Sequence, residues 1–293
     1  MKILLAGQNG IIGSYLFNEL KSHYHLFGIG KGAHISNNYC DLDLTDIKRV
    51  ENFINQQIHF DVLIFLVGLA HDKGRNQDYP VFEKINFITL INLLESMKKL
   101  DKVPAKIIFS STISVYGEKM DRDFYCEEDI LNPNSPYAKT KILAENYLNK
   151  TFSNKSWILR FAPVYSEKFK LNITRRTTIK GKNYKVGKGE NKLSLLNIKN
   201  IYYAVNQILE GKLPSGTYNI ADQKIYTFND LLNYTNIKTQ ITIPKIIPKT
   251  AYTLGKLLNN IFLQENSIKL LTDNIYSTTK LEKYIKLPYS LSD

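Results

Sequence analysis

Cysteine is scarce in this chain of 293 residues, which contains only Cys40 and Cys126. Two cysteines cannot form a disulfide framework in a chain of this length, and their spacing fits no zinc-binding motif. We therefore expect two inert, reduced thiols of the kind found in cytoplasmic proteins, and no metal site.

Long apolar runs are also lacking, since no stretch approaches the roughly 18 apolar residues that a membrane-spanning helix needs. The short apolar run at the N-terminus is broken at residues 7–10, and no small-residue cleavage site follows it, so we do not expect a signal peptide. Hydrophobic residues make up 43% of the chain and charged residues 23%, as in ordinary soluble globular proteins. We expect a cytoplasmic protein without a membrane span.

Acidic residues are fewer than basic ones: the chain has 27 Asp and Glu and 39 Lys and Arg, which gives a formal net charge of +12. Such an excess favours phosphorylated substrates, nucleic acid or anionic membranes as partners. The basic residues form no dense block; the nearest approach to one comprises Arg175, Arg176, Lys180, Lys182, Lys185 and Lys188. A compositional bias towards Lys, Ile and Asn explains the charge equally well. Because no nucleic-acid-binding module accompanies it, we expect no nucleic-acid partner.

The first 160 residues alternate between strand-like and helix-like segments. Apolar runs predict strands at residues 2–6, 25–29, 61–67, 106–110 and 157–161. Helical spacing of apolar residues predicts helices at residues 12–21, 46–57, 80–100 and 136–148. Continuous apolar strands that alternate with helices indicate a parallel sheet with both faces covered.

The alternation ends after about residue 163. Residues 166–192 are polar, rich in lysine and interrupted by glycines, which predicts loops over a site. A helix at residues 198–209 and a strand at residues 217–221 are expected further on. With no repeat or low-complexity linker present, we expect the two halves to pack closely.

A glycine motif directly follows the first predicted strand. Gly7, Gly10 and Gly13 form the pattern G-x-x-G-x-x-G and lead into a predicted helix. Glycines permit a tight turn and let the backbone approach a pyrophosphate, while the helix N-terminus supplies free N–H groups and a positive dipole end. This context predicts a site for a dinucleotide.

The residues after the second predicted strand bear on which dinucleotide binds. An NAD enzyme usually has an acidic residue there for the adenosine ribose, but residues 28–32 contain no carboxylate. Lys31, together with His34, could instead face a 2′-phosphate, which slightly favours NADP over NAD. The alternative is that Lys31 is a solvated loop lysine.

A pair of residues suited to proton transfer follows in the motif Y-x-x-x-K, with Tyr137 and Lys141 four residues apart. Residues i and i+4 share a helix face, so the ammonium can lie beside the phenol and favour its ionised form. Thr112, which follows a buried strand, would end at the crevice where such sheets bind ligands. Its hydroxyl could bond the substrate oxygen that Tyr137 protonates.

These motifs resemble those of the extended short-chain dehydrogenase/reductase family, in the NAD-dependent epimerase/dehydratase group that acts on nucleotide-linked sugars. The resemblance is specific as far as about Tyr165 and looser beyond, where the segment that ends in residues 216–221 is similar to a later helix and strand of the family. It implies an α/β fold with a Rossmann-type doubly wound parallel sheet in residues 1–165. A smaller substrate-binding α/β domain would occupy residues 166–293, with parts of residues 193–221 packing back on the first domain.

The resemblance also implies roles for individual residues. Thr112, Tyr137 and Lys141 would be catalytic, and Asp41 would contact the adenine. Further cofactor-binding residues would be Gly7, Asn9, Gly10, Ile11, Ile12, Lys31, Leu42, Val67, Gly68, Leu69, Asn86, Ser110, Ser111, Tyr137, Lys141, Pro163 and Val164. Residues 68–71 resemble the loop beneath the cofactor, and residues 160–165 resemble the segment beside the nicotinamide.

Departures from the family pattern narrow the chemistry. Sugar-nucleotide 4,6-dehydratases of this family have an acid pair directly after the threonine, but here Ile113 and Ser114 occupy those positions. Neither is a general acid at neutral pH, so dehydration is disfavoured and 4-epimerisation or reduction of a 4-keto sugar remains. The usual acidic residue before the later helix is Asn200, so the C-terminal half fits the family less closely.

The expected partner is a nucleotide-diphosphate sugar, used in surface polysaccharide synthesis. Its sugar would contact Thr112, Ile113, Ser114 and Tyr137. Its diphosphate needs cations, for which Arg175, Arg176 and Lys185 are candidates, although each could equally be a solvated basic residue. A homodimer is a reasonable expectation from the resemblance.

Two other functions stay open at this point. One is a non-catalytic dinucleotide sensor or scaffold, which the intact set of Thr112, Tyr137 and Lys141 argues against, because a sensor needs no proton relay. The other is an NADPH-dependent reductase for a carbonyl that is not linked to a nucleotide.

Overall fold

The computed structural model describes residues 1–32, 38–70, 78–117, 119–235, 239 and 241–293. The chain forms two compact units, each assembled from separate stretches. Unit 1 comprises Met1–Val115, Ser135–Leu159 and Pro214–Thr217. Unit 2 comprises Tyr116–Asn134, Arg160–Leu213 and Tyr218–Asp293. A division of the chain into two domains at residue 165 stays a prediction.

Within the described part of the chain, the main sheet has seven strands. In chain order they are β1 (Lys2–Ala6), β2 (His25–Gly30), β3 (Tyr39–Asp41), β4 (Val62–Phe65), β5 (Lys106–Thr112), β7 (Ser156–Phe161) and β13 (Gly216–Ile220). In space the order is β13-β7-β5-β4-β1-β2-β3, and β1 pairs in parallel with both β2 and β4. The chain therefore moves outward in both directions from β1, which confirms the doubly wound, Rossmann-type α/β sheet.

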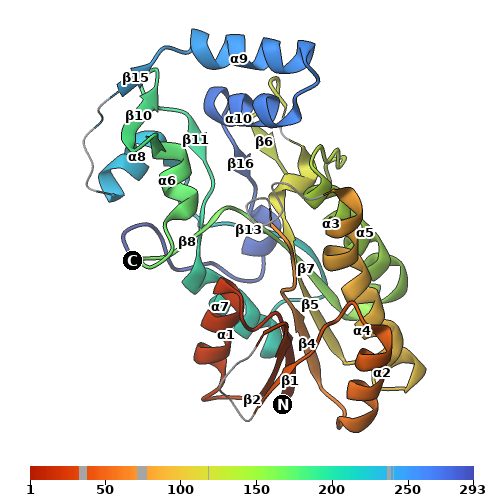
Figure 1. The fold of residues 1–293 in the computed structure, drawn as a ribbon. Helices are drawn as coiled ribbons and strands as arrows, with labels where there is room; N and C mark the ends of the chain where they lie inside the picture. The colour runs from red at the N-terminus through yellow and green to blue at the C-terminus, as the bar shows by residue number, and fades with distance from the viewer. Residues whose placement is uncertain (33–37, 71–77, 118, 236–238, 240) are drawn as a thin grey trace. The chain divides into compact units, whose positions relative to one another are not determined.

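Helices cover both faces of this sheet. Those of unit 1 are α1 (Ile11–Leu20), α2 (Ile47–Gln56), α3 (Tyr79–Glu83), α4 (Thr89–Lys99) and α5 (Pro136–Thr151). A π-helical turn (Lys84–Ile88) joins α3 to α4. In Figure 1, α1 lies on one side of the sheet, and α2, α4 and α5 lie on the other.

Local sequence explains where these helices begin. The Asp46 carboxylate accepts hydrogen bonds from two backbone N–H groups in the first turn of α2. The Ser135 hydroxyl accepts one from Ala138 at the start of α5, and Pro136, whose fixed φ suits a helix, takes the first position.

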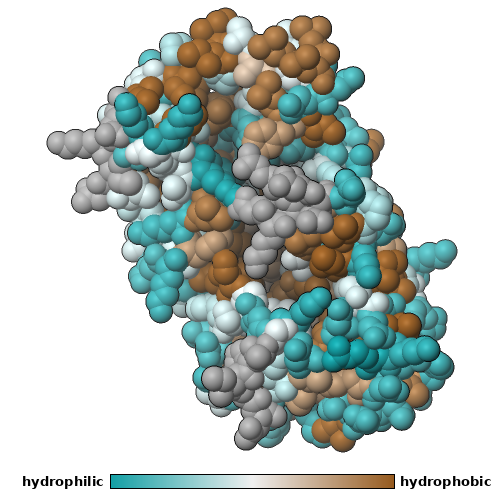
Figure 2. Space-filling model, in the orientation of Figure 1, coloured by the Kyte–Doolittle hydropathy of each residue, from teal (hydrophilic) through white to brown (hydrophobic). Residues whose placement is uncertain are grey.

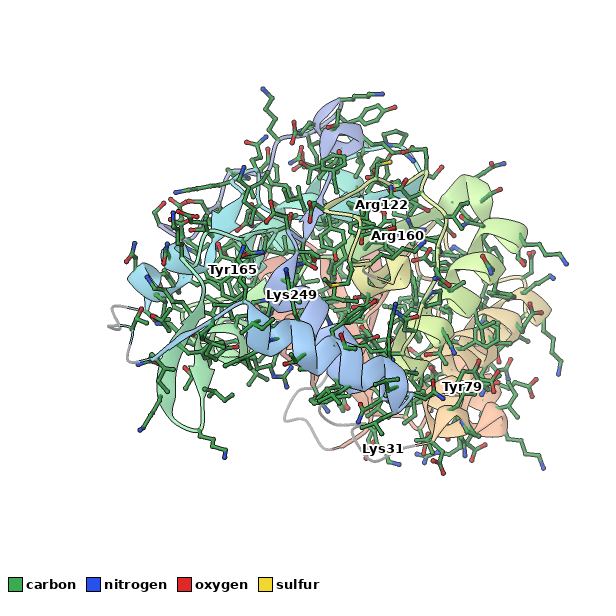
Figure 3. The ribbon with its side chains drawn as sticks, turned by 90° about the horizontal axis from the view of Figure 1, so that it is seen from above. Lys31, Tyr79, Arg122, Arg160, Tyr165 and Lys249 are labelled. Atoms are coloured by element: carbon green, nitrogen blue, oxygen red, sulfur yellow. The ribbon has the colours of Figure 1, made fainter. Side chains whose placement is uncertain are left out.

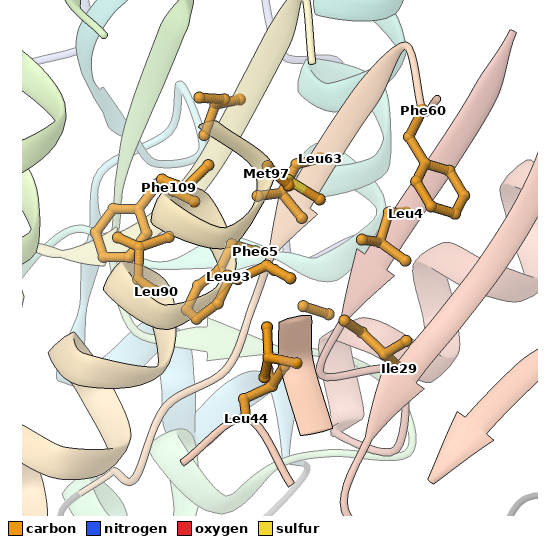
Figure 4. Close-up of a cluster of buried hydrophobic side chains, with 14 of the residues drawn as sticks. Leu4, Ile29, Leu44, Phe60, Leu63, Phe65, Leu90, Leu93, Met97 and Phe109 are labelled. Carbon is orange, nitrogen blue, oxygen red and sulfur yellow. The ribbon is translucent and has the colours of Figure 1, made fainter. Parts of the chain in front are cut away.

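A large buried cluster lies between the sheet and its helices. Figure 4 shows aliphatic and aromatic side chains from β1, β4 and β5 packed against those of α4, including Phe65, Phe109, Leu93 and Met97. Each of these is nearly or fully inaccessible to solvent. Burying such side chains contributes about 1.5–3 kcal/mol each, which holds the strand ends rigidly in place.

Unit 2 is built from short strands and helices. Its strands are β6 (Phe124–Tyr125), β8 (Val164–Tyr165), β9 (Thr178–Ile179), β10 (Lys182–Val186), β11 (Lys192–Leu193), β12 (Leu196–Asn197), β14 (Tyr226–Thr227), β15 (Ile241–Ile243) and β16 (Ile275–Tyr276). Its helices are α6 (Leu171–Thr177), α7 (Ile198–Leu209), α8 (Phe228–Tyr234), α9 (Ile246–Leu257), α10 (Ile261–Leu271) and α11 (Thr279–Glu282). A separate cluster around Tyr165, Ile173, Tyr226 and Leu231 forms its core.

The expectation of loops over residues 166–192 is wrong, because this stretch contains α6 and the antiparallel pair of β9 and β10. Helix α6 has only two turns and buries little besides Ile173 and Thr177. Such a short helix leaves too few apolar positions to show a helical period in the sequence.

None of the helices in the described residues is both long and apolar enough to cross a membrane.

A candidate active site at the strand ends of unit 1

The glycine turn after β1 lies directly against the end of β4. Gly7 has a φ of +91°, and a Cβ there would come within 3.0 Å of the backbone of Leu66 and Val67. A Cβ on Gly13 would come within 2.1 Å of the Gly7 carbonyl oxygen. These two glycines are therefore required for the turn to close and for α1 to pack against it.

The N-terminus of α1 is suited to an anion. Its N-cap, Gly10, has an extended backbone, and among the described residues no side chain caps this end and no acidic residue lies in the first turn. The first N–H groups and the positive end of the helix dipole therefore favour a phosphate-sized anion. Ile11 and Ile12, expected to bind the cofactor, lie in this first turn.

The Asn9 side chain links the glycine turn to the end of β2. Its amide nitrogen donates to the carbonyl oxygens of Lys31 (3.1 Å) and Gly32 (3.2 Å) and to the Tyr39 hydroxyl (2.8 Å). The Tyr39 hydroxyl donates in turn to the Gly32 carbonyl oxygen. This set of bonds joins the turn after β1 and the residues after β2 to Tyr39, the first residue of β3.

Charged groups follow at the same strand ends. The Lys31 ammonium lies 3.3 Å from an Asp43 carboxylate oxygen, and 83% of the Lys31 side chain is exposed. Asp41 accepts a hydrogen bond from the backbone N–H of Gly32. Leu42 is buried, and its N–H donates to Gly30. His34 lies outside the described residues.

Asn86 holds the segment after β4. It lies in the π-helical turn, a helix geometry frequent at functional sites, and is fully buried. Its amide oxygen accepts from the Leu69 N–H at 2.6 Å, and its nitrogen donates to the Leu69 carbonyl and to Thr140. Val67, Gly68 and Leu69 are thereby positioned at the end of β4, whereas His71 lies outside the described residues.

The three predicted catalytic side chains lie together in unit 1. The Thr112 hydroxyl forms a hydrogen bond with the Tyr137 phenol, and this bond lowers the pKa of Tyr137, while burial raises it more strongly, to about 12. The Lys141 ammonium lies 6.0 Å from the centre of the Tyr137 ring and 4.7 Å from that of Phe109. The end of β5 and the first turns of α5 thus bring an alcohol, a phenol and an amine together.

Lys141 is almost completely buried. Its ammonium donates to the carbonyl oxygens of Ser110 (2.9 Å) and Val67 (3.4 Å), and a Cβ on Gly68 would lie 3.3 Å from it. Burial lowers the pKa of Lys141 to about 7, and the charge of Glu145 acts in the opposite direction. The amine can therefore exchange its proton near neutral pH.

The two residues after Thr112 provide no acid. Ile113 is buried, and the Ser114 hydroxyl lies 3.3 Å from that of Thr112. The Ser114 backbone N–H also donates to Thr112, which fixes the turn that follows β5. A hydroxyl and an alkyl group at these positions are unsuited to proton donation during elimination of water.

The remaining predicted site residues belong to unit 2. Pro163 and Val164 lie at β8, where the Val164 carbonyl accepts a hydrogen bond from Asn172. Arg175 and Arg176 occupy the last turn of α6, and Arg176 donates to the Asn172 carbonyl. Lys185 lies on β10. Their part in binding a diphosphate stays a prediction.

The structure adds residues that the sequence patterns did not single out. Glu145 is buried beside Lys141 and accepts a hydrogen bond from the Ser111 hydroxyl. Thr140 and Tyr39 bond to Asn86 and Asn9, as described above. Only Glu145 had a signal in the sequence, because it follows Lys141 by one helical turn and so shares its face.

Comparison with known proteins agrees with this geometry. The model of a family described as "NAD dependent epimerase/dehydratase family" matches residues 3–221. This match includes the glycine turn, Thr112 and both residues of the Y-x-x-x-K motif.

Two curated relatives match part of the chain at low sequence identity. The Bacillus subtilis protein YtcB, described as an uncharacterized UDP-glucose epimerase, is 28% identical over 200 residues, or 61% of this chain and 62% of the relative. The Staphylococcus aureus protein CapI is 25% identical over 189 residues, or 56% of this chain and 54% of the relative. The chain thus matches less than two thirds of the length of either relative.

Solved structures are similar over the whole chain. The UDP-glucose 4-epimerase of Thermotoga maritima, solved with UDP-glucose, has a TM-score of 0.74 at 22% identity and covers 99% of this chain and 95% of its own. The UDP-glucuronic acid 4-epimerase of Bacillus cereus, solved with NAD, has a TM-score of 0.72 at 22% identity and covers 100% and 95%. At such identities the likeness is one of fold.

Proposed function

We propose, since the chain belongs to the NAD dependent epimerase/dehydratase family, that it is an NAD(P)-dependent enzyme acting at carbon 4 of a nucleotide-linked sugar. The reaction is either 4-epimerisation or reduction of a 4-keto sugar. The observation on which this proposal depends is the hydrogen bond between Thr112 and Tyr137, with the Lys141 ammonium beside the same ring.

The residues of unit 1 fit a dinucleotide. The uncapped start of α1 and the glycine turn suit the pyrophosphate, with Asp41 and Leu42 near the adenosine. Asn86 keeps Val67, Gly68 and Leu69 in place beneath the cofactor, while Ser110 and Ser111 flank it at the end of β5. When bound, the nicotinamide accepts or donates the hydride.

The side chains of this protein transfer the proton that accompanies the hydride. In oxidation, the ionised Tyr137 oxygen takes the proton from the sugar hydroxyl at C4; in reduction, the phenol returns a proton to that oxygen. Thr112 donates a hydrogen bond to the reacting oxygen, and the Lys141 ammonium favours the ionised phenol. Ile113 and Ser114 line the sugar site without supplying an acid, so water is not eliminated.

The substrate is proposed to be a nucleotide-diphosphate sugar, bound through cations such as Arg175 and Arg176. Its product would be an activated sugar for surface polysaccharide synthesis in the cytoplasm. We propose NADP as the slightly preferred cofactor, because the exposed Lys31 ammonium can leave Asp43 for a 2′-phosphate.

The test is turnover by the purified protein. We expect inversion at C4 of UDP- or dTDP-linked hexoses, followed by NMR without added cofactor, if the protein is an epimerase. Stoichiometric consumption of NADPH or NADH with a 4-keto sugar nucleotide would instead identify a reductase. Consumption of NADPH only with carbonyls that lack a nucleotide would overturn the proposed substrate class.

The matched variant is Tyr137→Phe, which removes the reacting hydroxyl and keeps the ring. We expect turnover to fall about 10²–10⁴-fold, because positioned proton transfer contributes that much, while dinucleotide binding measured by fluorescence is unchanged. Full activity in this variant would contradict the role of Tyr137 as the proton-transfer group. Dinucleotide binding without any turnover in the wild-type protein would favour a dinucleotide sensor over an enzyme.

A further inference from the structure

Helices α9 and α10 expose an unusual number of large apolar side chains. On α9, Leu257 is 76% exposed, Leu254 53% and Ile246 62%; Phe262 on α10 is 61% exposed. Ile247, Leu258 and Ile261 are exposed as well. We call these seven residues the α9–α10 apolar face. In Figure 2, brown surface gathers at the top of the view, where Figure 1 places α9.

The apolar residues of α9 share one side of the helix. At 3.6 residues per turn, Ile246, Ile247, Leu254, Leu257 and Leu258 fall within an arc of about 120°. Pro248 and Gly255, the buried positions of α9, fall on a different side. At Gly255 the α10 side chains approach so closely that an added Cβ would lie 3.0 Å from Gln264. The apolar arc therefore points away from α10 and into solvent.

Lysines accompany this face. Lys245, Lys249 and Lys256 are exposed and lie on one flank of α9, about 60–100° beyond the edge of the apolar arc. Figure 3 labels Lys249 on this helix. Residues 244–272 contain four lysines and one glutamate, so the segment is basic in a chain that is itself basic. A lysine on the flank of a helix can extend its charged end along the surface while its aliphatic stem packs beside apolar groups.

We propose that the α9–α10 apolar face binds the surface of an anionic lipid membrane. An exposed apolar arc flanked by lysines is the pattern of helices that lie in the membrane interface, with apolar side chains among the acyl chains and ammonium groups at the phosphates. A second copy of this chain fits less well, because symmetric pairing of the face would bring the lysines of two copies together. The inference is independent of the reaction proposed for unit 1.

The experiment is co-sedimentation of the full chain with vesicles. We expect binding to vesicles of 30% phosphatidylglycerol and 70% phosphatidylcholine to exceed binding to pure phosphatidylcholine at least tenfold. High salt should weaken it, because screening reduces the attraction between the lysines and the phosphates. Equal binding to both vesicles, or none to either, would overturn the proposal.

Two variants separate the apolar and the charged contributions. Leu257→Ser combined with Leu258→Ser should lower vesicle binding at least tenfold, because two inserted side chains are lost. Lys249→Gln combined with Lys256→Gln should lower binding to anionic vesicles by about fivefold for each charge and leave binding to neutral vesicles unchanged. All four side chains are exposed, so the melting temperature should stay the same.

Ile130→Ser is the matched control, since Ile130 is 89% exposed and belongs to neither helix. It should bind vesicles like the wild-type protein. Light scattering of the same samples tests the other occupant. If the protein is a dimer that Leu257→Ser with Leu258→Ser converts to a monomer, while vesicle binding does not change, the face is an interface between copies and the proposal is wrong.

Discussion

At the scale of single residues, the candidate site depends on opposing influences on one phenol. Burial raises the pKa of Tyr137 and the hydrogen bond with Thr112 lowers it, and the Lys141 ammonium lies 6.0 Å from the centre of the same ring. At neutral pH the Lys141 ammonium is itself close to losing its proton, because burial lowers the pKa of Lys141 to about 7. A small change at either neighbour should therefore shift the pH at which proton transfer occurs.

Thr112→Val should change both the rate and its pH dependence. Without the hydroxyl, the pKa of Tyr137 rises, so less phenolate is present at a given pH and the acidic limb of kcat/KM for oxidation moves to higher pH. Loss of one donor at the reacting oxygen should also lower kcat roughly 10²-fold. Thr112→Ser should restore both, and an unshifted profile in Thr112→Val would contradict the bond between these side chains.

Lys31→Ala should distinguish the two cofactors. If the ammonium leaves Asp43 to bind a 2′-phosphate, its removal should raise KM for NADPH about tenfold and hardly change KM for NADH. Steady-state kinetics with both cofactors measures this. Lys48→Ala, an exposed lysine on α2, is the control. An unchanged KM for both cofactors would mean that Lys31 is a solvated surface lysine, and equal increases would mean that it does not recognise the 2′-phosphate.

At the scale of elements, two glycines of the turn and α1 should affect different properties, one the binding of the dinucleotide and the other the stability of the fold. A Cβ on Gly10 would lie 3.3 Å from the Gly7 carbonyl oxygen, a distance that a small shift relieves. A Cβ on Gly13 would lie 2.1 Å from the same atom, so α1 would have to move away from the turn. Only the first change leaves the strand–turn–helix element intact.

We therefore expect opposite outcomes from two alanine variants. Gly10→Ala should keep the melting temperature within a few degrees but weaken dinucleotide binding about tenfold, because the methyl group occupies the approach of the pyrophosphate. Gly13→Ala should cost roughly 2–3 kcal/mol through overpacking, lowering the melting temperature by about 5 °C or more. Calorimetry and fluorescence titration measure the two effects; unchanged binding in Gly10→Ala would place the dinucleotide elsewhere.

At the scale of the whole molecule, each unit has its own means of holding distant segments together. In unit 2, the buried carboxylate of Asp222 accepts hydrogen bonds from the hydroxyls of Tyr165 and Tyr226, from the Asn197 N–H and from the Asn200 side chain. Asn200 also bonds both ways with the backbone of Tyr289. The carboxylate thus joins β8, β14, α7 and the C-terminal segment.

Asp222→Ala should destabilise the protein by about 3 kcal/mol, because several buried donors lose their acceptor at once. Urea unfolding should show a lower midpoint. Asp121→Ala, which removes an exposed carboxylate, should change the free energy of unfolding by less than about 0.5 kcal/mol. A similar effect of both changes would mean that the Asp222 bonds do not stabilise unit 2.

The sequence by itself determined six of the seven strands of the Rossmann-type sheet and the helices between them, because buried strands show continuous apolar runs and helices show their period and caps. It missed β3 (Tyr39–Asp41), because this strand has only three residues, none of them fully buried, and so shows no apolar run. The prediction for residues 80–100 was right about helix but not about the π-helical turn that holds Asn86, since its backbone bonds leave no mark on the apolar pattern. The family resemblance proposed Thr112, Tyr137 and Lys141 together, because Thr112 lies in the motif at the end of β5 and the other two share the Y-x-x-x-K motif.

Tertiary structure alone decided what depends on contacts between distant segments. The Ser111–Glu145 bond, the Asn9–Tyr39 bond and the pairing of Lys31 with Asp43 all join residues more than ten positions apart. Tertiary structure also decided which carboxylate lies in the core of unit 2. Asn200 stands where the family has an acidic residue, and its side-chain amide donates a hydrogen bond to the carboxylate of Asp222, 22 residues further along the chain. Only the folded chain shows such pairs, because local sequence determines helices and strands but not which side chains meet once they pack.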